Sequence, residues 1–379
     1  MQLRYGMNPH QAARVTNATP VRVVSGTTSY LNLLDALTGW QLVREAAVVA
    51  GRPAAASVKH VSPTGVAMAG PLDDTARETW QVAPGAGALT SAYVRARDAD
   101  PKSSYGDMIA VSEPVDAELA GFLVRVVADG VIAPGFEPGT VPVLAAKKRG
   151  TFVVLEADPA YVPPEWEQRE VFGVGLVQQR DGAAVTPDLL SVEAGGQLPP
   201  SAVLDALLGL VTVRYTQSNS VALMRGGAAL GIGAGQQNRV DCVQLAARKA
   251  AAWWLRRHEL IRGLPAVASM PRQDRLNWQL RMTDADMTPA QRSEFGVLFG
   301  GATAALAAPA RAEWLARLDE VTLVSDGFLP FRDNIDEASR IGVRHVIEPG
   351  GSSRAAGVEA ACAEYGMTLA RTGLRLFRH

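Results

Sequence analysis

The chain has 379 residues, of which 47% are hydrophobic and 20% charged, so it is long enough for two or three structural units with a sizeable core. Its formal net charge of -1 gives no general electrostatic attraction to nucleic acid or to an anionic membrane, and neither is expected as a partner. Apolar runs such as residues 207–213 are too short to span a bilayer and the N-terminus lacks a signal-peptide core, so a cytoplasmic protein is predicted.

The first half of the chain alternates helix-like and strand-like segments, which predicts an α/β layered unit. Pro63 and Gly65 are expected to form a turn that closes the first strand. The predicted elements are a helix over 40–50, a strand over 54–61, a strand over 107–112, a helix over 117–130, and a strand with a loop over 131–136.

The second half repeats this style. Gly226 and Gly227 separate two short apolar runs, which predicts a hairpin with a two-residue turn. Cys242 and Cys362 lack metal-ligand spacing and are expected to be reduced, buried thiols. The other predicted elements are a helix over 201–216, a helix with an apolar stripe at Val240, Val243, Ala247, Ala250 and Trp254, and a strand over 321–326. The predicted units are 1–165, 166–254 with 319–379, and a helical insertion over 255–318 in the second unit.

The segment SVKHVSPTG (57–65) places Lys59 and His60 at a strand end. Neighbouring strand residues point to opposite faces, so both can enter one cavity only where the chain leaves strand geometry. A nearby ammonium would disfavour the imidazolium and leave His60 able to accept a proton, and it could also stabilise an oxyanion. The alternative is a structural histidine beside a solvated lysine.

Other candidate segments are weaker when taken singly. The glycine-rich turn 231–235 opens a helix and offers backbone amides to a ligand, but it is neither a Walker loop nor a complete dinucleotide motif. Asn219 and Arg239 flank it and offer an amide and a guanidinium. The apolar group 328–331 could wall an aromatic ring or belong to the core. The basic C-terminal segment 372–379 could bind phosphate or be a free tail.

Together these segments resemble one family, AICAR transformylase, from end to end. The motifs occur in the family's order and are LRYGMNPHQ (3–11), SVKHVSPTG (57–65), SSYGD (103–107), DGVIAPGF (129–136), YTQSNSV (215–221), GIGAGQQNRVD (231–241), SDGFLPFRDN (325–334) and TGLRLFRH (372–379).

The resemblance implies transfer of a formyl group from 10-formyltetrahydrofolate to the 5-amino group of AICAR in purine synthesis. It also implies a duplicated fold similar to cytidine deaminase and a homodimer with shared active sites. A zinc deaminase of related fold is excluded because the sequence has neither H-x-E nor P-C-x-x-C. Because the chain begins almost at the first transformylase motif, it is expected to act without a cyclohydrolase domain, which implies a separate IMP cyclohydrolase.

Site residues carry over by motif. His60 would be the general base, Lys59 would stabilise the tetrahedral intermediate, and Asn219 would orient the substrate. AICAR would be bound by Arg4, Tyr5, Gly106, Asp129, Arg239, Phe328 and Arg375. The folate would be bound by Tyr105, Val240, Leu329, Pro330, Phe331, Asp333, Asn334, Ser352 and Ser353. A possible potassium site would comprise Val213, Thr216, Ser218, Ser220, Asp326 and Leu376.

Several positions depart from the family's usual residues, and they lie mainly on the folate side. They are Lys102, Tyr105, Gly327, Leu329 and Arg378. Two alternatives therefore remain open at this point: a paralogue that formylates a related amino-carboxamide nucleotide in nucleoside natural-product synthesis, and a non-catalytic nucleotide-binding homologue.

Overall fold

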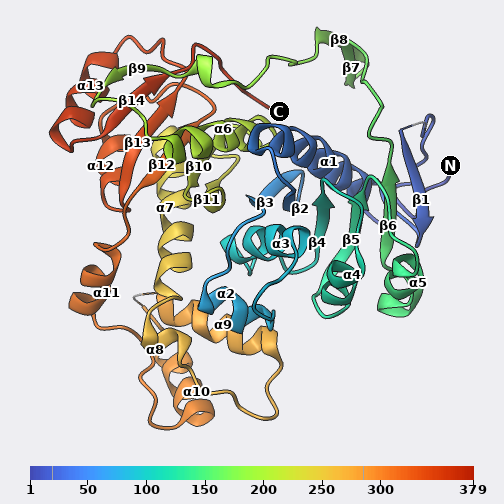
Figure 1. Cartoon of the computed structure of the whole chain (residues 1–379), viewed down its shortest axis with the longest axis horizontal. Coiled ribbons are helices and arrows are strands. Elements are labelled where there is room, and N and C mark those ends of the chain that lie inside the picture. Colours follow the sequence, from blue (N-terminus) through green and yellow to red (C-terminus); the bar gives the residue numbers. More distant parts are fainter. Residues whose placement is uncertain (19, 285) are drawn as a thin grey trace.

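A computed structural model describes residues 1–18, 20–284 and 286–379; residue 285 of the predicted helical insertion lies outside the description. Two six-stranded sheets organise the chain (Figure 1). The first contains β1 Val21–Ser25, β2 Ala54–Lys59, β3 Ser62–Met68, β4 Asp107–Val111, β5 Ala128–Ala133 and β6 Val153–Ala157. The second contains β9 Ser191–Ala194, β10 Val221–Met224, β11 Ala229–Gly233, β12 Val321–Ser325, β13 Val343–Glu348 and β14 Thr368–Arg371.

Helices cover the sheets. In the first half they are α1 Tyr30–Ala50, α2 Asp74–Trp80, α3 Ala88–Ala99, α4 Ala117–Val124 and α5 Thr140–Ala145, with a 3₁₀ turn at Lys147–Gly150. In the second half they are α6 Pro200–Arg214, α7 Arg239–Leu255, α12 Asp333–Ser339 and α13 Ala355–Glu364, with a 3₁₀ turn at Pro187–Leu189. Between α7 and β12 lie α8 Glu259–Arg262, α9 Arg272–Thr283, α10 Pro289–Phe299 and α11 Ala308–Leu315.

The two sheets have the same topology. The first runs β3-β2-β4-β5-β6-β1 and the second runs β11-β10-β12-β13-β14-β9. In both, three antiparallel pairings flank two parallel ones in the same order. The hairpins β2–β3 and β10–β11 even change register at equivalent places, after Ser57 and after Leu223. The predicted α/β class is therefore confirmed, while the relation to cytidine deaminase and the predicted unit boundaries stay predictions.

Helices α1 and α6 lie side by side, each against its own sheet (Figure 1). Both contain the same short sequence, LDALTG at 34–39 and LDALLG at 204–209. Its glycine permits close approach to the sheet: a Cβ on Gly39 would lie 2.8 Å from Ala110 Cβ, and one on Gly209 would lie 2.4 Å from Val324 Cγ2. The two helices share one hydrophobic core, and α3 and α7 cover the opposite faces of the two sheets.

Two sequence predictions in the first half are wrong in detail. Pro63 and Gly65 do not form a turn but lie inside β3, because the chain already reverses at His60 and Val61. Gly65 is needed there for packing, since a Cβ would lie 2.0 Å from the carbonyl oxygen of Ala96 on α3. The predicted helix over 117–130 ends at Val124, because the following segment pairs with both β4 and β6 as β5.

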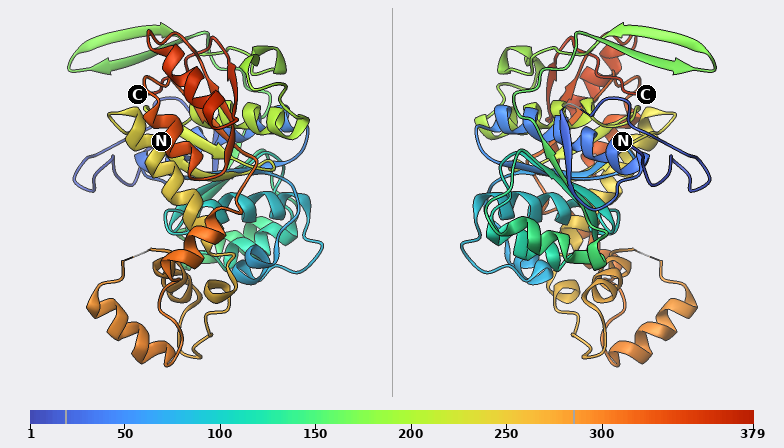
Figure 2. Two further views of the ribbon diagram at one scale, coloured as in Figure 1. Left: turned by 90° about the vertical axis from the view of Figure 1, so that its left-hand side faces the viewer. Right: turned by 90° about the vertical axis from the view of Figure 1, so that its right-hand side faces the viewer.

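Two parts extend away from the sheets (Figure 2). One is the hairpin of β7 Trp166–Val171 and β8 Val174–Gln179, which is exposed along its whole length. The other is the helical region that contains α8 to α11. Both cysteines are buried, as expected. Within the described ranges, no helix has the length and apolar character that crossing a membrane requires.

Candidate active site

A two-residue turn between β2 and β3 carries His60. Lys59 pairs with Ser62, and both turn residues adopt positive φ, 54° at His60 and 62° at Val61. This geometry matches the type I′ hairpin turn, which usually takes Asn-Gly or Gly-Gly. A left-handed conformation costs roughly 1–2 kcal/mol per ordinary residue, and a β-branched residue such as Val61 adopts it rarely. The turn exposes His60 and takes the chain out of strand geometry at His60 itself, before the predicted turn at Pro63 and Gly65.

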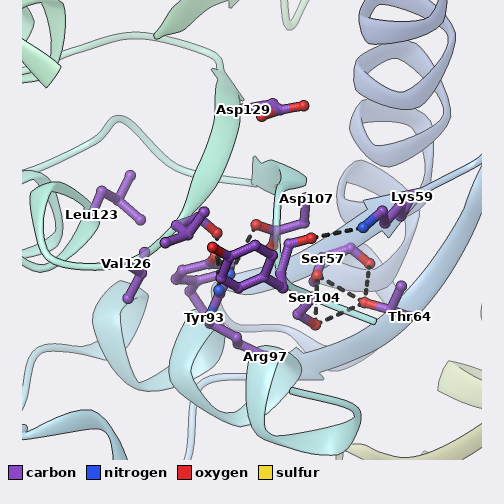
Figure 3. Close-up of polar contacts among 12 residues, drawn as sticks. Ser57, Lys59, Thr64, Tyr93, Arg97, Ser104, Asp107, Leu123, Val126 and Asp129 are labelled. Atoms are coloured by element: carbon purple, nitrogen blue, oxygen red, sulfur yellow. Dashed lines mark hydrogen bonds and ion pairs between the residues drawn. The ribbon is translucent and has the colours of Figure 1, made fainter. Parts of the chain in front are cut away.

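Lys59 is held from the neighbouring loop. Its Nζ donates to the carbonyl oxygen of Tyr105 at 2.7 Å (Figure 3). Beneath it, the hydroxyls of Ser57, Thr64 and Ser104 bond to one another at 2.8–2.9 Å, and all three residues are buried. These bonds join β2, β3 and the 101–106 loop, so they fix the carbonyl that holds the Lys59 ammonium.

A buried ionic group lies next to that loop. Arg97 on α3 donates to the carboxylate of Asp107 at 2.8 Å, and the hydroxyl of Tyr93 donates to the same carboxylate at 3.0 Å (Figure 3). Arg97 also donates to the carbonyl oxygen of Val127. Burial raises the pKa of Tyr93 well above its usual value, so its hydroxyl stays protonated. The group anchors the start of β4 directly after Tyr105 and Gly106.

Lys59 and His60 line a cavity of about 370 Å³. Its walls come from both halves of the molecule, and Gln217 on the second half donates its backbone N–H to Ser62 Oγ at 3.3 Å. The volume is within the range of small-ligand sites. The other lining residues are Ser62, Pro63, Thr64, Ser103, Gln217, Ile232, Ala234, Gly235 and Lys249.

Asn219 and Arg239 are bonded to each other at the start of β10 and α7. Arg239 Nη2 donates to Asn219 Oδ1 at 2.8 Å, and Asn219 Nδ2 donates to the carbonyl oxygen of Gln236 at 2.9 Å. The guanidinium of Arg239 is buried against the carboxylate of Asp326, so the predicted AICAR-binding arginine is engaged inside the protein. Its role towards the nucleotide stays a prediction.

The residues of the possible potassium site form one hydrogen-bonded network. Asp326 Oδ2 accepts from Ser218 Oγ at 2.6 Å and from the Ser220 backbone at 3.0 Å, and its carbonyl oxygen accepts from Leu376. Ser220 Oγ and the Thr216 backbone donate to the carbonyl oxygen of Val213. The carbonyl, hydroxyl and carboxylate oxygens gathered here are the donor type that hard cations prefer.

The predicted folate residues lie mainly in the loops that follow β12 and β13. Phe331 is 51% exposed, whereas Leu329 is fully buried in the second-half core. The neighbouring Phe328, predicted to bind AICAR, is 45% exposed. The Leu329 backbone donates to the buried carboxylate of Glu348 at 2.6 Å. Asn334 caps the turn by donating to the carbonyl oxygen of Phe331 at 3.0 Å. Asp333, Ser352 and Ser353 lie near the starts of α12 and α13, Pro330 is half-buried, and Val240 lies in the first turn of α7.

The remaining predicted AICAR residues lie on the surface or at strand ends. The guanidinium of Arg4 lies 4.7 Å from the ring centre of Tyr5, and its Nη2 donates to the Tyr5 hydroxyl. Asp129 at the start of β5 pairs with Lys148 at 2.6 Å. Arg375 is exposed above Phe377. Gly106 has φ of 77° and open space where a Cβ would stand, so its backbone is free of side-chain cover.

Sequence reasoning missed Asp35, which supports the His60 turn from α1. Its Oδ1 accepts the Val61 backbone N–H at 2.6 Å. Burial raises the pKa of this carboxyl, although the backbone N–H donor of Val61 and the nearby His60 act in the opposite direction and lower it. A carboxylate inside the apolar run YLNLLDALTGW was the available signal.

The chain is similar in sequence to known purine biosynthesis proteins. Residues 1–249 match the family described as the AICARFT/IMPCHase bienzyme. The chain is 31% identical to the bifunctional purine biosynthesis protein PurH of Jannaschia sp. (strain CCS1) and of Roseobacter denitrificans, and 30% identical to that of Dinoroseobacter shibae. Each alignment covers 100% of this chain and 59% of the relative, so the chain spans about three-fifths of their length. The chain therefore belongs to the AICARFT/IMPCHase bienzyme family.

Proposed function

We propose that the protein is a formyltransferase that moves a formyl group from 10-formyltetrahydrofolate to the 5-amino group of AICAR. The observation that carries the proposal is the placement of Lys59 and His60 in one cavity walled by both halves of the chain. Family membership supports it, because the relatives are bifunctional purine biosynthesis proteins.

The chemistry divides between the two side chains. The AICAR amine is conjugated to an electron-poor ring and is a weak nucleophile, so His60 would accept its proton as the amine attacks the formyl carbon. The formyl oxygen then gains negative charge. The Lys59 ammonium has three donors, of which one is used by Tyr105, so two remain for that oxygen. Collapse of the intermediate breaks the bond between the formyl carbon and the folate nitrogen, and the proton held by His60 would pass to that nitrogen.

A homodimer is part of the proposal. The β7–β8 hairpin leaves large apolar side chains uncovered in the single chain, and a second copy would cover them. They are Trp166, Val171, Phe172, Val174, Leu176 and Val177. Sedimentation at assay concentration should give a dimer, and a monomer there would contradict shared sites.

Potassium at the Asp326 network is proposed as a structural ion, since it would sit among residues that also hold Asn219 and Arg239. We expect formyl transfer to depend on potassium when sodium is substituted at equal ionic strength. Equal rates in both salts would remove the ion from the proposal.

The decisive measurement follows tetrahydrofolate release with AICAR as acceptor. His60→Ala and Lys59→Ala should each lower kcat by about 10²–10⁴-fold while circular dichroism and oligomeric state stay unchanged. His258→Ala, at the start of α8, is the matched histidine control and should keep turnover. Turnover near the original rate in a purified His60→Ala protein would exclude the assignment of the base. An inert native protein that still binds AICAR would favour a divergent acceptor.

A further inference from the structure

Asp35 holds the His60 turn from α1. Its Oδ1 accepts the backbone N–H of Val61, the second residue of the turn, at 2.6 Å. Only 7% of Asp35 is exposed, and it lies on the face of α1 that packs against the first sheet. The carboxylate is therefore a fixed point to which the tip of the hairpin is attached.

The second half contains the same arrangement without a histidine. Asp205 accepts the N–H of Gly226 at 2.8 Å and of Gly227 at 2.6 Å, and these glycines form the turn between β10 and β11. Asp35 and Asp205 occupy the same place in the shared LDAL sequence of α1 and α6. A buried aspartate under this turn is thus a property of the fold.

The two turns differ in what they demand. Gly226 and Gly227 have φ of 59° and 76°, which glycine adopts freely. His60 and Val61 have nearly the same φ but disfavour it. In the first half, the Asp35 carboxylate therefore stabilises a turn whose two residues disfavour the required backbone conformation. One of these two residues is the histidine.

We propose that Asp35 is the positioning residue of His60, holding the imidazole in the cavity and stabilising its protonated form after it takes the amine's proton. The proposal rests on the proposed function, since it assumes that His60 is the base. The charged groups around the imidazole are Asp35 on α1, Lys59 on its own hairpin and Lys249 on α7 across the cavity, with Asp129 of β5 near Asp35. Lys249 is itself paired with Asp100 at 3.1 Å, so Asp35 is the carboxylate that lies directly behind the turn.

The test uses Asp35→Asn in the full-length protein. An asparagine keeps one oxygen for the Val61 N–H but removes the charge. The acid limb of the kcat/KM pH profile should move to lower pH, because the imidazolium loses a nearby anion. The His60 imidazole signal, assigned with His60→Gln, should titrate with the same displacement in proton NMR. We expect kcat to fall about tenfold and KM for AICAR to change little.

Asp205→Asn is the matched control, because it makes the same chemical change under the equivalent turn. It should leave the His60 titration and the pH profile in place. Asp35→Ala should lower kcat about 10²-fold, and adding Val61→Gly should recover part of that loss, because glycine adopts the turn without help.

An unchanged pH profile and an unchanged His60 titration in Asp35→Asn would overturn the proposal, as would an equal displacement in Asp205→Asn. The NMR titration also separates the two levels of inference. If the native protein does not transfer formyl groups, the proposed function fails, while a displaced titration still establishes the action of Asp35 on His60.

Discussion

The two halves of the molecule place equivalent turns at two different cavities. The first turn, with Lys59 and His60, lines the cavity of about 370 Å³, and the second, with Arg225 and Gly226, lines one of about 520 Å³. Each cavity is completed by residues of the opposite half. Beneath the first turn lie the buried hydroxyls of Ser57 and Thr64, whereas the matching positions beneath the second are Leu223 and Leu230.

The fold supplies the same backbone features to both turns, and the side chains of the first turn add the chemistry. Both halves provide a buried aspartate, a bulged hairpin and a two-residue turn with positive φ. The chemistry in the first half then requires two further things: an imidazole in a conformation that glycine would adopt more readily, and polar groups that hold the adjacent ammonium. Backbone strain of this kind is found at functional sites.

The largest effect is expected when the first turn is made like the second. His60→Gly removes the base and should lower kcat by about 10²–10⁴-fold. It also removes left-handed strain, so the free energy of unfolding should rise by about 0.5–1 kcal/mol. Urea denaturation and formyl-transfer assays on one preparation measure both. A variant that loses stability would show that the His60 side chain contributes more packing than strain.

The next test replaces each glycine of the turn between β10 and β11 by alanine. A Cβ on Gly227 would lie 1.9 Å from the Cε of Met68, which is buried, whereas Gly226 has open space. Gly227→Ala should therefore destabilise by about 3 kcal/mol through crowding added to strain, and Gly226→Ala by about 1 kcal/mol through strain alone. Denaturant midpoints distinguish them. Equal losses would mean that Met68 moves aside without cost.

The free energy of unfolding should depend on pH through Asp205, the aspartate beneath the second turn. Burial raises the pKa of Asp205 from 3.8 to about 6, against the two glycine N–H donors. The folded chain then binds this proton more tightly than the unfolded chain. The stabilisation from protonation is complete below pH 3.8 and is lost as the pH rises through 6.

Asp205→Asn should remove this dependence. The difference in unfolding free energy between the native protein and the variant should change by about 2 kcal/mol between pH 4 and pH 7. Denaturation at a series of pH values measures it. A constant difference would show that the carboxylate titrates alike in the folded and unfolded chains.

The smallest effect concerns the hydroxyls beneath Lys59. Thr64→Val keeps the shape but leaves Ser57 and Ser104 bonded only to each other, and it should lower the unfolding free energy by about 1 kcal/mol. Leu230→Val, at the matching position of the second half, removes one methylene and is the control for volume. An unchanged unfolding free energy in Thr64→Val would show that the hydroxyl has no specific role.

Sequence patterns predicted the parts of the fold in which the turn residues and the adjacent strand residues both favour the observed structure. The Gly226–Gly227 hairpin is confirmed because its turn residues are those the geometry favours, and the strands near 107–112 and 321–326 are confirmed as continuous buried runs. The turn after the first strand was predicted at Pro63 and Gly65 instead of His60 and Val61, because His and Val are not typical turn residues. Gly65 serves helix packing instead.

Within the candidate site, Lys59 and His60 could be singled out from the sequence because their chemistry is visible in one segment. Ser104 and Lys249 could not, because each reaches the site from a different element. For Asp35 the only signal was a carboxylate inside an apolar run. The burial of Leu329 likewise depends on a core formed from segments far apart in the chain.

The shared core beneath α1 and α6 has a consequence for how the chain folds and for how it can be divided. Apolar side chains of Trp40, Val43, Leu207 and Val211 belong to one continuous cluster, so each half covers surface that the other would otherwise expose to water. Unfolding should then be a single cooperative event instead of two successive ones. Although the halves repeat one topology, either half expressed alone would lack the partner that completes its interior.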